Sequence, residues 1–216
     1  REVYNAVEEY ISTAYNQAAA AERNAVGFVM TIYRRRLASS FHALATTLEE
    51  RLKSVKSGKF TSVATEEDVS DDESADEAMD AEDAEKLERQ ALVAEETSTI
   101  EALLADVKCL PLDTKAKVLL AQLNRLREQE HFQAIVFTQY SATLDFLKKF
   151  LFENDFRVLC FSGKGGEQPS REGKWMTKSR EEIKRLFRAE EADVLIATDA
   201  AAEGLNFQFC GALINY

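Results

Sequence analysis

Four short apolar runs in the second half of the chain restrict its fold more than any other feature of the sequence. They are residues 134–137, 158–161, 194–197 and 213–216. Runs that are apolar at nearly every position are typical of strands buried on both faces. Stretches with helical spacing, at about 141–154 and 179–189, separate the first three runs. Strands that alternate with helices indicate right-handed crossovers, so we expect an α/β fold with a parallel sheet and flanking helices over 111–216.

The first half of the chain has a helical pattern that an acidic segment interrupts. Residues 1–57 contain no proline, and their apolar residues recur at spacings of three, four and five, which predicts amphipathic helices with one buried stripe. Residues 58–85 change character: the run 70–85 is built from Asp, Glu, Ser and Ala with one Met and cannot bury a core, so we expect a disordered linker over 58–85. Helical spacing resumes over 86–110.

The net charge of -11 comes from that acidic linker and not from the chain as a whole. Between Glu66 and Glu85 there are 12 acidic residues and no basic one. Without them, 26 acidic residues remain against 27 basic ones. The low total charge therefore does not exclude a nucleic-acid partner, because the rest of the chain is close to neutral and has local basic clusters.

Composition also argues against a membrane span and against a metal site. No apolar run approaches the roughly 18 residues that span a membrane, so we expect no membrane partner. The chain has three widely spaced cysteines without a CxxC pair and only two histidines, so we expect no metal site. Cys109, Cys160 and Cys210 each have apolar neighbours, which predicts buried, reduced thiols and a cytoplasmic protein.

Small polar residues follow three of the apolar runs. Thr138 and Gln139 follow the first run, Ser162 and Gly163 end the second, and Thr198 follows the third. Ligands of parallel sheets collect at the carboxyl ends of the strands. Hydroxyl groups and glycine backbone N–H groups at that edge can bind phosphates, so the functional site is expected there.

Two of these segments resemble helicase motifs. The string 194–206 resembles motif V of superfamily-two helicases and translocases, and 135–140 resembles motif IV. The segment Phe161-Ser162-Gly163, followed by Arg180-Glu181-Glu182, is similar to the region between those motifs. The segments 206–209 and 36–40 are similar to the bacterial Swi/Snf-like, RapA-like branch.

The resemblance implies the second RecA-like lobe of an ATP-dependent DNA helicase or translocase from a bacterial cytoplasm. Its partners would be double-stranded DNA and the N-terminal RecA-like lobe of the same protein. That N-terminal lobe would hold most of the ATP and Mg²⁺. The sequence has no Walker A lysine, no DExx box on a strand and no motif VI arginines. We therefore expect no catalytic residues in this fragment, which would end before motif VI and would not hydrolyse ATP alone.

The resemblance also assigns individual contacts by position. It places nucleic-acid contacts at Thr138, Gln139, Gly163 and Thr198. It places cofactor contacts at Glu203, Gly204 and Asn206. Gly204 would let the backbone approach the nucleotide, and Asn206 stands where relatives often have an Asp near the ATP ribose. Glu203 departs from the Arg common in DEAD-box proteins, which argues against RNA unwinding.

The segment 164–180 is longer than this family usually needs. Its five basic residues, two acidic residues and one tryptophan are Lys164, Arg171, Lys174, Lys178, Arg180, Glu167, Glu172 and Trp175. A basic loop with an aromatic side chain suits nucleic-acid contact, and we assign that role to Lys174 and Arg180. The alternative is a mobile surface loop that Trp175 anchors.

A function of another class also fits the pattern. The chain could be a non-catalytic α/β interaction module in which the acidic segment 58–85 binds a protein partner. An upstream lobe with a phosphate-binding lysine and a DExx box would favour the motor over this module.

Overall fold

The computed structural model describes residues 2–17, 23–57, 94–111, 113–128, 132–170, 172–198 and 210–216. They belong to two compact units, Arg1–Pro111 and Leu112–Tyr216. The acidic linker predicted over 58–85 lies outside the described residues, as does the start of the helix predicted over 86–110.

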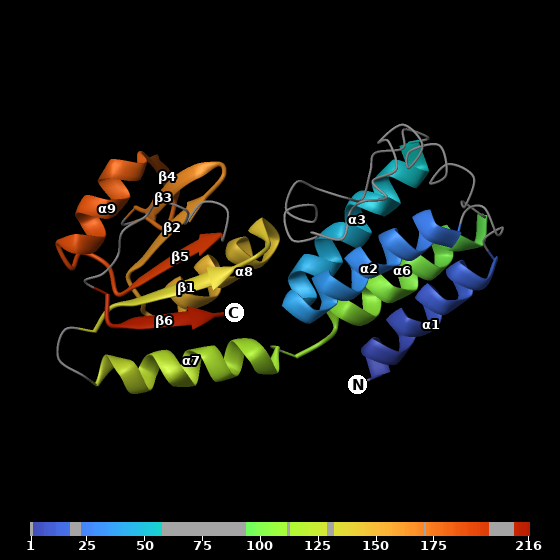
Figure 1. The fold of residues 1–216 in the computed structure, drawn as a ribbon, viewed down its shortest axis with the longest axis horizontal. Helices are drawn as coiled ribbons and strands as arrows, with labels where there is room; N and C mark the ends of the chain where they lie inside the picture. The colour runs from blue at the N-terminus through green and yellow to red at the C-terminus, as the bar shows by residue number, and fades with distance from the viewer. Residues whose placement is uncertain are drawn as a thin grey trace. The chain divides into compact units, whose positions relative to one another are not determined.

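The described part of the first unit is helical. Its helices are α1 (Glu2–Gln17), α2 (Arg23–Ser39), α3 (Phe41–Ser57) and α6 (Ala94–Lys108) (Figure 1). Their apolar side chains form one core, whose largest fully buried members include Tyr33, Leu44, Leu48 and Ile100. Ser40 separates α2 from α3, and its hydroxyl accepts a hydrogen bond from the Ala43 N–H at 3.0 Å. This serine therefore caps the start of α3.

The second unit contains a six-stranded sheet in its described residues, with the order β4-β3-β2-β5-β1-β6. The strands are β1 (Ala134–Thr138), β2 (Val158–Ser162), β3 (Gly165–Pro169), β4 (Trp175–Lys178), β5 (Val194–Thr198) and β6 (Ala212–Asn215). The pairs β2–β5, β5–β1 and β1–β6 are parallel. The pairs β2–β3 and β3–β4 are antiparallel. The predicted α/β fold with a parallel sheet is confirmed for the four strands that were expected.

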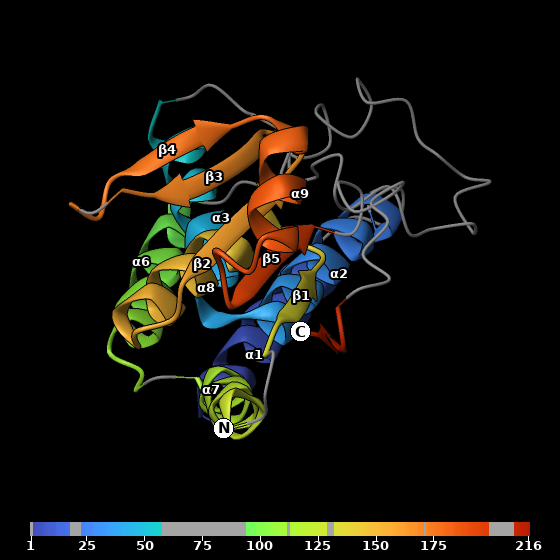
Figure 2. The ribbon, with the colours of Figure 1, turned by 90° about the vertical axis from the view of Figure 1, so that its left-hand side faces the viewer.

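Three helices cover the sheet in this unit's described residues: α7 (Thr114–Arg127), α8 (Ser141–Glu153) and α9 (Arg180–Arg188). Buried side chains of α7 and α8 pack with alternate strand residues such as Val136 and Ile196 on one face. Those of α9 pack with the intervening residues, such as Leu159 and Leu195, on the other face (Figures 1 and 2). This alternation is what a sheet buried on both faces requires.

The segment 164–180 differs from the predicted loop, because most of it forms the antiparallel hairpin β3–β4 on the outer edge of β2. Trp175 anchors this hairpin, since its ring meets that of Phe152 on α8 edge-to-face at 6.1 Å. Lys148 of α8 adds an ion pair with Glu167 of β3 at 2.6 Å. The anchoring role of Trp175 was foreseen as the alternative, but pairing with β2 was not.

Two predictions from composition can be compared with the structure. No helix in the described part of the chain is both long enough and apolar enough to cross a membrane. All three cysteines are free thiols, of which Cys160 is buried and Cys210 is half-buried. The expectation of burial is wrong for Cys109, which is exposed because it follows the last residue of α6, beyond the buried stripe.

Candidate nucleic-acid interface

Three hydroxyl side chains end neighbouring strands at the carboxyl edge of the sheet. Thr138 of β1 and Thr198 of β5 are paired residues in the register of these strands. Ser162 ends β2, one residue after Phe161, which is paired with Ala197. By the alternation of side chains along a strand, all three belong to the face that α7 and α8 cover. The sheet therefore gathers hydroxyl groups from three separate parts of the sequence.

The two threonines of this edge are deeply buried. Thr138 is 1% exposed and Thr198 is 4% exposed. The Thr138 hydroxyl has no hydrogen-bond partner among the described residues. A buried hydroxyl without a partner costs about 1–3 kcal/mol, so a ligand oxygen that reaches it would recover a hydrogen bond. Thr138 is therefore an unused donor beside the predicted phosphate contact of Thr198.

Gln139 and Gly163 occupy the turns that follow this edge. Gln139 is half-buried in the bend between β1 and α8. Gly163 lies with Lys164 in the short turn that joins β2 to β3, and no atom lies within 4 Å of where its Cβ would be. The turn is held by a hydrogen bond from the Lys164 N–H to the Ser162 hydroxyl at 3.2 Å. The backbone of this turn is thus open to a phosphate.

The two basic candidates lie at opposite ends of the β3–β4 hairpin. Arg180 begins α9, and its guanidinium carbon lies 5.6 Å from the centre of the Phe161 ring, near the carboxyl edge of β2. Lys174 precedes β4 in the turn at the other end, where Trp175 pairs with Pro169. The length of β4, about 10 Å at the usual rise of a strand, separates that turn from Lys178. The structure therefore brings Arg180 to the candidate edge and places Lys174 away from it.

The predicted nucleotide contacts follow directly on β5. Glu203, Gly204 and Asn206 lie within 199–209, outside the described residues. No group of three or more His, Cys, Asp or Glu side chains that could hold a metal ion occurs within the described ranges. The described part of the edge thus carries nucleic-acid candidates, namely Thr138, Gln139, Gly163, Arg180 and Thr198.

Comparison with known proteins agrees with this geometry. Residues 114–216, nearly all of the second unit, match the helicase conserved C-terminal domain. The second unit is thus similar to a helicase C-terminal lobe along nearly its whole length.

Two known proteins resemble the chain over a larger part of its length. The uncharacterized ATP-dependent helicase YqhH of Bacillus subtilis (strain 168) is 33% identical over 129 residues, which are 60% of this chain and 20% of that protein. The crystal structure of the Pyrococcus furiosus Hef helicase domain aligns with 91% of this chain and 33% of its own at a TM-score of 0.50 and 18% identity, which supports the fold. The chain thus spans one fifth of the first relative and one third of the second.

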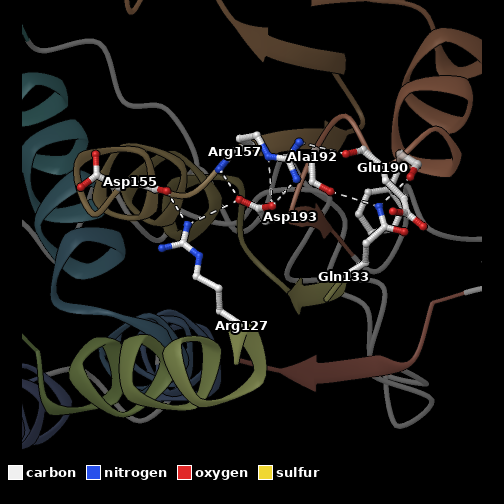
Figure 3. A network of polar contacts seen from close by, with 8 residues as sticks. Arg127, Gln133, Asp155, Arg157, Glu190, Ala192 and Asp193 are labelled. Carbon is white, nitrogen blue, oxygen red and sulfur yellow. Dashed lines mark hydrogen bonds and ion pairs between the residues drawn. The ribbon is translucent and has the colours of Figure 1, made fainter. Parts of the chain in front are cut away.

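The opposite edge of the sheet in the second unit is held by a polar network that the sequence analysis did not predict (Figure 3). Asp193 precedes β5 and accepts hydrogen bonds from the Arg157 guanidinium at 2.5 and 3.0 Å and from the Arg157 N–H at 2.9 Å. Arg127, at the end of α7, approaches the same carboxylate at 3.5 Å. Gln133 precedes β1 and donates to the carbonyls of Phe187 and Ala192 at 2.6 and 3.0 Å. The sequence did contain a pattern that could have predicted this ion pair: Arg157 and Asp193, of opposite charge, each stand directly before an apolar run.

This network makes the stability of the second unit depend on pH in the acidic range. Burial would raise the pKa of Asp193, but the hydrogen bonds and charge of Arg157 outweigh it and leave that pKa below its ordinary value. The stabilisation is therefore complete above the ordinary Asp pKa near 4 and is lost as the pH falls through that value toward the folded-state pKa.

We expect the difference in unfolding free energy between the wild type and Asp193→Asn to shrink as the pH is lowered from about 7 to about 3. Urea titrations followed by the fluorescence of Trp175, the sole tryptophan, would measure this difference within the second unit. A difference that stays constant over this range would contradict the assigned carboxylate role.

Proposed function

We propose that the chain is the C-terminal lobe of an ATP-dependent DNA helicase or translocase and supplies its motifs IV and V. The observation that carries this proposal is the pairing of Thr138 with Thr198 at the carboxyl edge of the matched domain. The strands that bear the two motifs are far apart in the sequence but are neighbours in the sheet. Their small polar ends would contact successive parts of one nucleic-acid backbone.

The chemistry of this edge favours contacts to phosphate over contacts to bases. Hydroxyls, glycine N–H groups and a guanidinium are the donors found there, and such donors position a protein on the backbone without reading the sequence. Donors of this kind would hold a nucleic acid without strong sequence preference. We propose double-stranded DNA as the partner on the basis of the motif resemblance. The Swi/Snf-like, RapA-like branch and a cytoplasmic location are part of the same proposal and are supported by the motif resemblance of 36–40 and 206–209.

ATP and Mg²⁺ would be held chiefly by an N-terminal RecA-like lobe of the same protein, with Glu203, Gly204 and Asn206 closing the site from this side. Bound ATP would supply the free energy that moves the two lobes relative to each other. The described residues of this chain would hold the nucleic-acid backbone. The chain alone is proposed to be inactive as an ATPase because phosphoryl transfer needs groups from both lobes.

The non-catalytic interaction module is the less favoured alternative. The match to the helicase conserved C-terminal domain and the likeness to an ATP-dependent helicase both favour the motor. The segment that would bind a protein partner, 58–85, lies outside the described residues.

The substitution Thr198→Ala tests the proposed function. In the full-length protein we expect DNA-stimulated ATP hydrolysis to fall at least about tenfold, which corresponds to about 1.4 kcal/mol of lost binding in the transition state. Thr198→Ser, which keeps the hydroxyl, should retain most of the rate. Thr114→Ala is the matched control, because Thr114 is exposed at the start of α7. Unchanged rates for Thr198→Ala would remove motif V from the mechanism.

A further inference from the structure

The β3–β4 hairpin has one end beside the candidate edge and one end away from it. Figure 2 shows the two strands side by side, with the turn between them at one end and α9 at the other. At the α9 end, Ser162 pairs with Gly165 and Gly166 pairs with Lys178. Because Ser162 also ends β2, this end of the hairpin continues the carboxyl edge of the sheet outward from Thr198.

Three basic residues gather at the α9 end, and we name this group, Lys164, Lys178 and Arg180, the hairpin corner. Lys164 is exposed in the turn between β2 and β3 and forms no ion pair with any described residue. Lys178 ends β4, and Arg180 begins α9 two residues later. The positive end of the helix dipole of α9 adds to the same potential.

The acidic groups near the corner are already engaged. Glu182 caps α9 by accepting a hydrogen bond from the Ser179 N–H at 2.9 Å, and its carboxylate also lies 3.6 Å from Lys178. Glu181 lies 3.7 Å from Lys184 on the same helix. Glu167, on β3, is paired with Lys148. The charge of Lys178 is therefore partly compensated by Glu182, whereas no described carboxylate pairs with Lys164.

The hairpin holds its corner in a fixed place. Trp175 and the Lys148–Glu167 pair attach it to α8 on one face of the sheet. On the other face Gly166 lies flush against α9, since a Cβ at that residue would be 2.4 Å from the Ile183 Cγ1. Charges on a rigid support lose less entropy when they bind, so they contribute more to affinity than charges on a flexible loop.

We propose that the hairpin corner is a second set of phosphate contacts, with Lys164 as its main residue. It would extend the DNA-binding surface from the carboxyl ends of the strands to the outer edge of the sheet. The proposal rests on the proposed function. It assigns Lys164 and Lys178 to DNA binding, and it assigns no contact to Lys174 at the opposite end of the hairpin.

The salt dependence of DNA binding by the full-length protein tests this assignment. A fluorescently labelled short duplex would be titrated at several salt concentrations, and the slope of log K against log salt would be compared between variants. Each lost phosphate contact reduces the slope by about 0.9. We expect Lys164→Ala to weaken binding severalfold and to reduce the slope by about one contact, and Lys164→Arg to retain both. Lys174→Ala is the matched control and should change neither.

The outcomes separate this proposal from the proposed function. An unchanged slope for Lys164→Ala, in a protein whose binding is weakened by Thr198→Ala, would overturn the corner and leave the function intact. Equal losses for Lys164→Ala and Lys174→Ala would also overturn it, because they would indicate diffuse attraction. Absence of duplex binding by the wild type would remove the proposed function itself. The fluorescence of Trp175 would verify that each variant is folded.

Discussion

Replacement of Asp193 by alanine is expected to lower the free energy of unfolding of the second unit by about 2 kcal/mol. The carboxylate is the acceptor for the backbone N–H of Arg157 at 2.9 Å, and its side chain is only 12% exposed. A buried donor that loses its acceptor costs about 1–3 kcal/mol. The Arg157 guanidinium adds less, because its side chain is 59% exposed and can return to water.

Urea unfolding at neutral pH, followed by Trp175 fluorescence, would measure the effect. Asp193→Asn should destabilise less than Asp193→Ala, since the amide oxygen can still accept one hydrogen bond. Glu191→Ala is the matched control, because this carboxylate is exposed and lies 3.8 Å from an exposed Arg185. We expect that control to change the stability by no more than about 0.5 kcal/mol. A loss of the same size for Glu191→Ala and Asp193→Ala would contradict a specific role of the network.

Replacement of Gly166 by alanine is expected to destabilise the second unit by about 2 kcal/mol. The added methyl carbon would lie 2.4 Å from the Ile183 Cγ1 and 2.9 Å from the Lys178 carbonyl oxygen. Overpacking of this kind costs about 1–3 kcal/mol because backbone or side chains must shift. The same urea titration would measure it.

Two further variants make this prediction specific. Gly163→Ala should leave the stability nearly unchanged, because no atom lies within 4 Å of its added Cβ. In the Ile183→Ala background, which removes the colliding Cγ1, Gly166→Ala should cost less than in the wild type. The relief would be partial, since the Lys178 carbonyl remains. Fully additive losses in this double-mutant cycle would show that Gly166 does not act through α9.

The two edges of the sheet differ in how far their polar groups are satisfied within the described residues. At the amino edge, charged groups pair with one another and with backbone, as Asp193 does with Arg157, which aligns the starts of β2 and β5. At the carboxyl edge, Thr138 keeps a buried hydroxyl without a described partner and Gly163 keeps open space. The polar groups described at the amino edge therefore satisfy one another, whereas the Thr138 hydroxyl at the carboxyl edge is left for a ligand to satisfy.

The α/β class and the candidate edge were predictable because they depend on local patterns. Short runs such as 194–197, which are apolar at nearly every position, are typical of buried strands, and in a parallel sheet the residues after such strands share one edge. Thr138 and Thr198 could therefore be placed together before their register was known. The hairpin could not be predicted in this way, because Gly165 to Pro169 contains no apolar alternation.

The amino-acid sequence by itself determined which segments are buried strands, which are helices, and which polar residues follow the strands. Only the tertiary structure decided which strands pair and which side chains are neighbours. It turned 164–180 into a hairpin because the outer edge of β2 was free to pair and Trp175 could pack on Phe152. In this hairpin Lys174 lies away from the candidate edge, whereas Lys178 and Arg180 lie near it. The fold also brings Asp193 and Arg157 together. The physical reason is that burial and helix periodicity are encoded locally, whereas strand pairing depends on edges that exist only after the chain has folded.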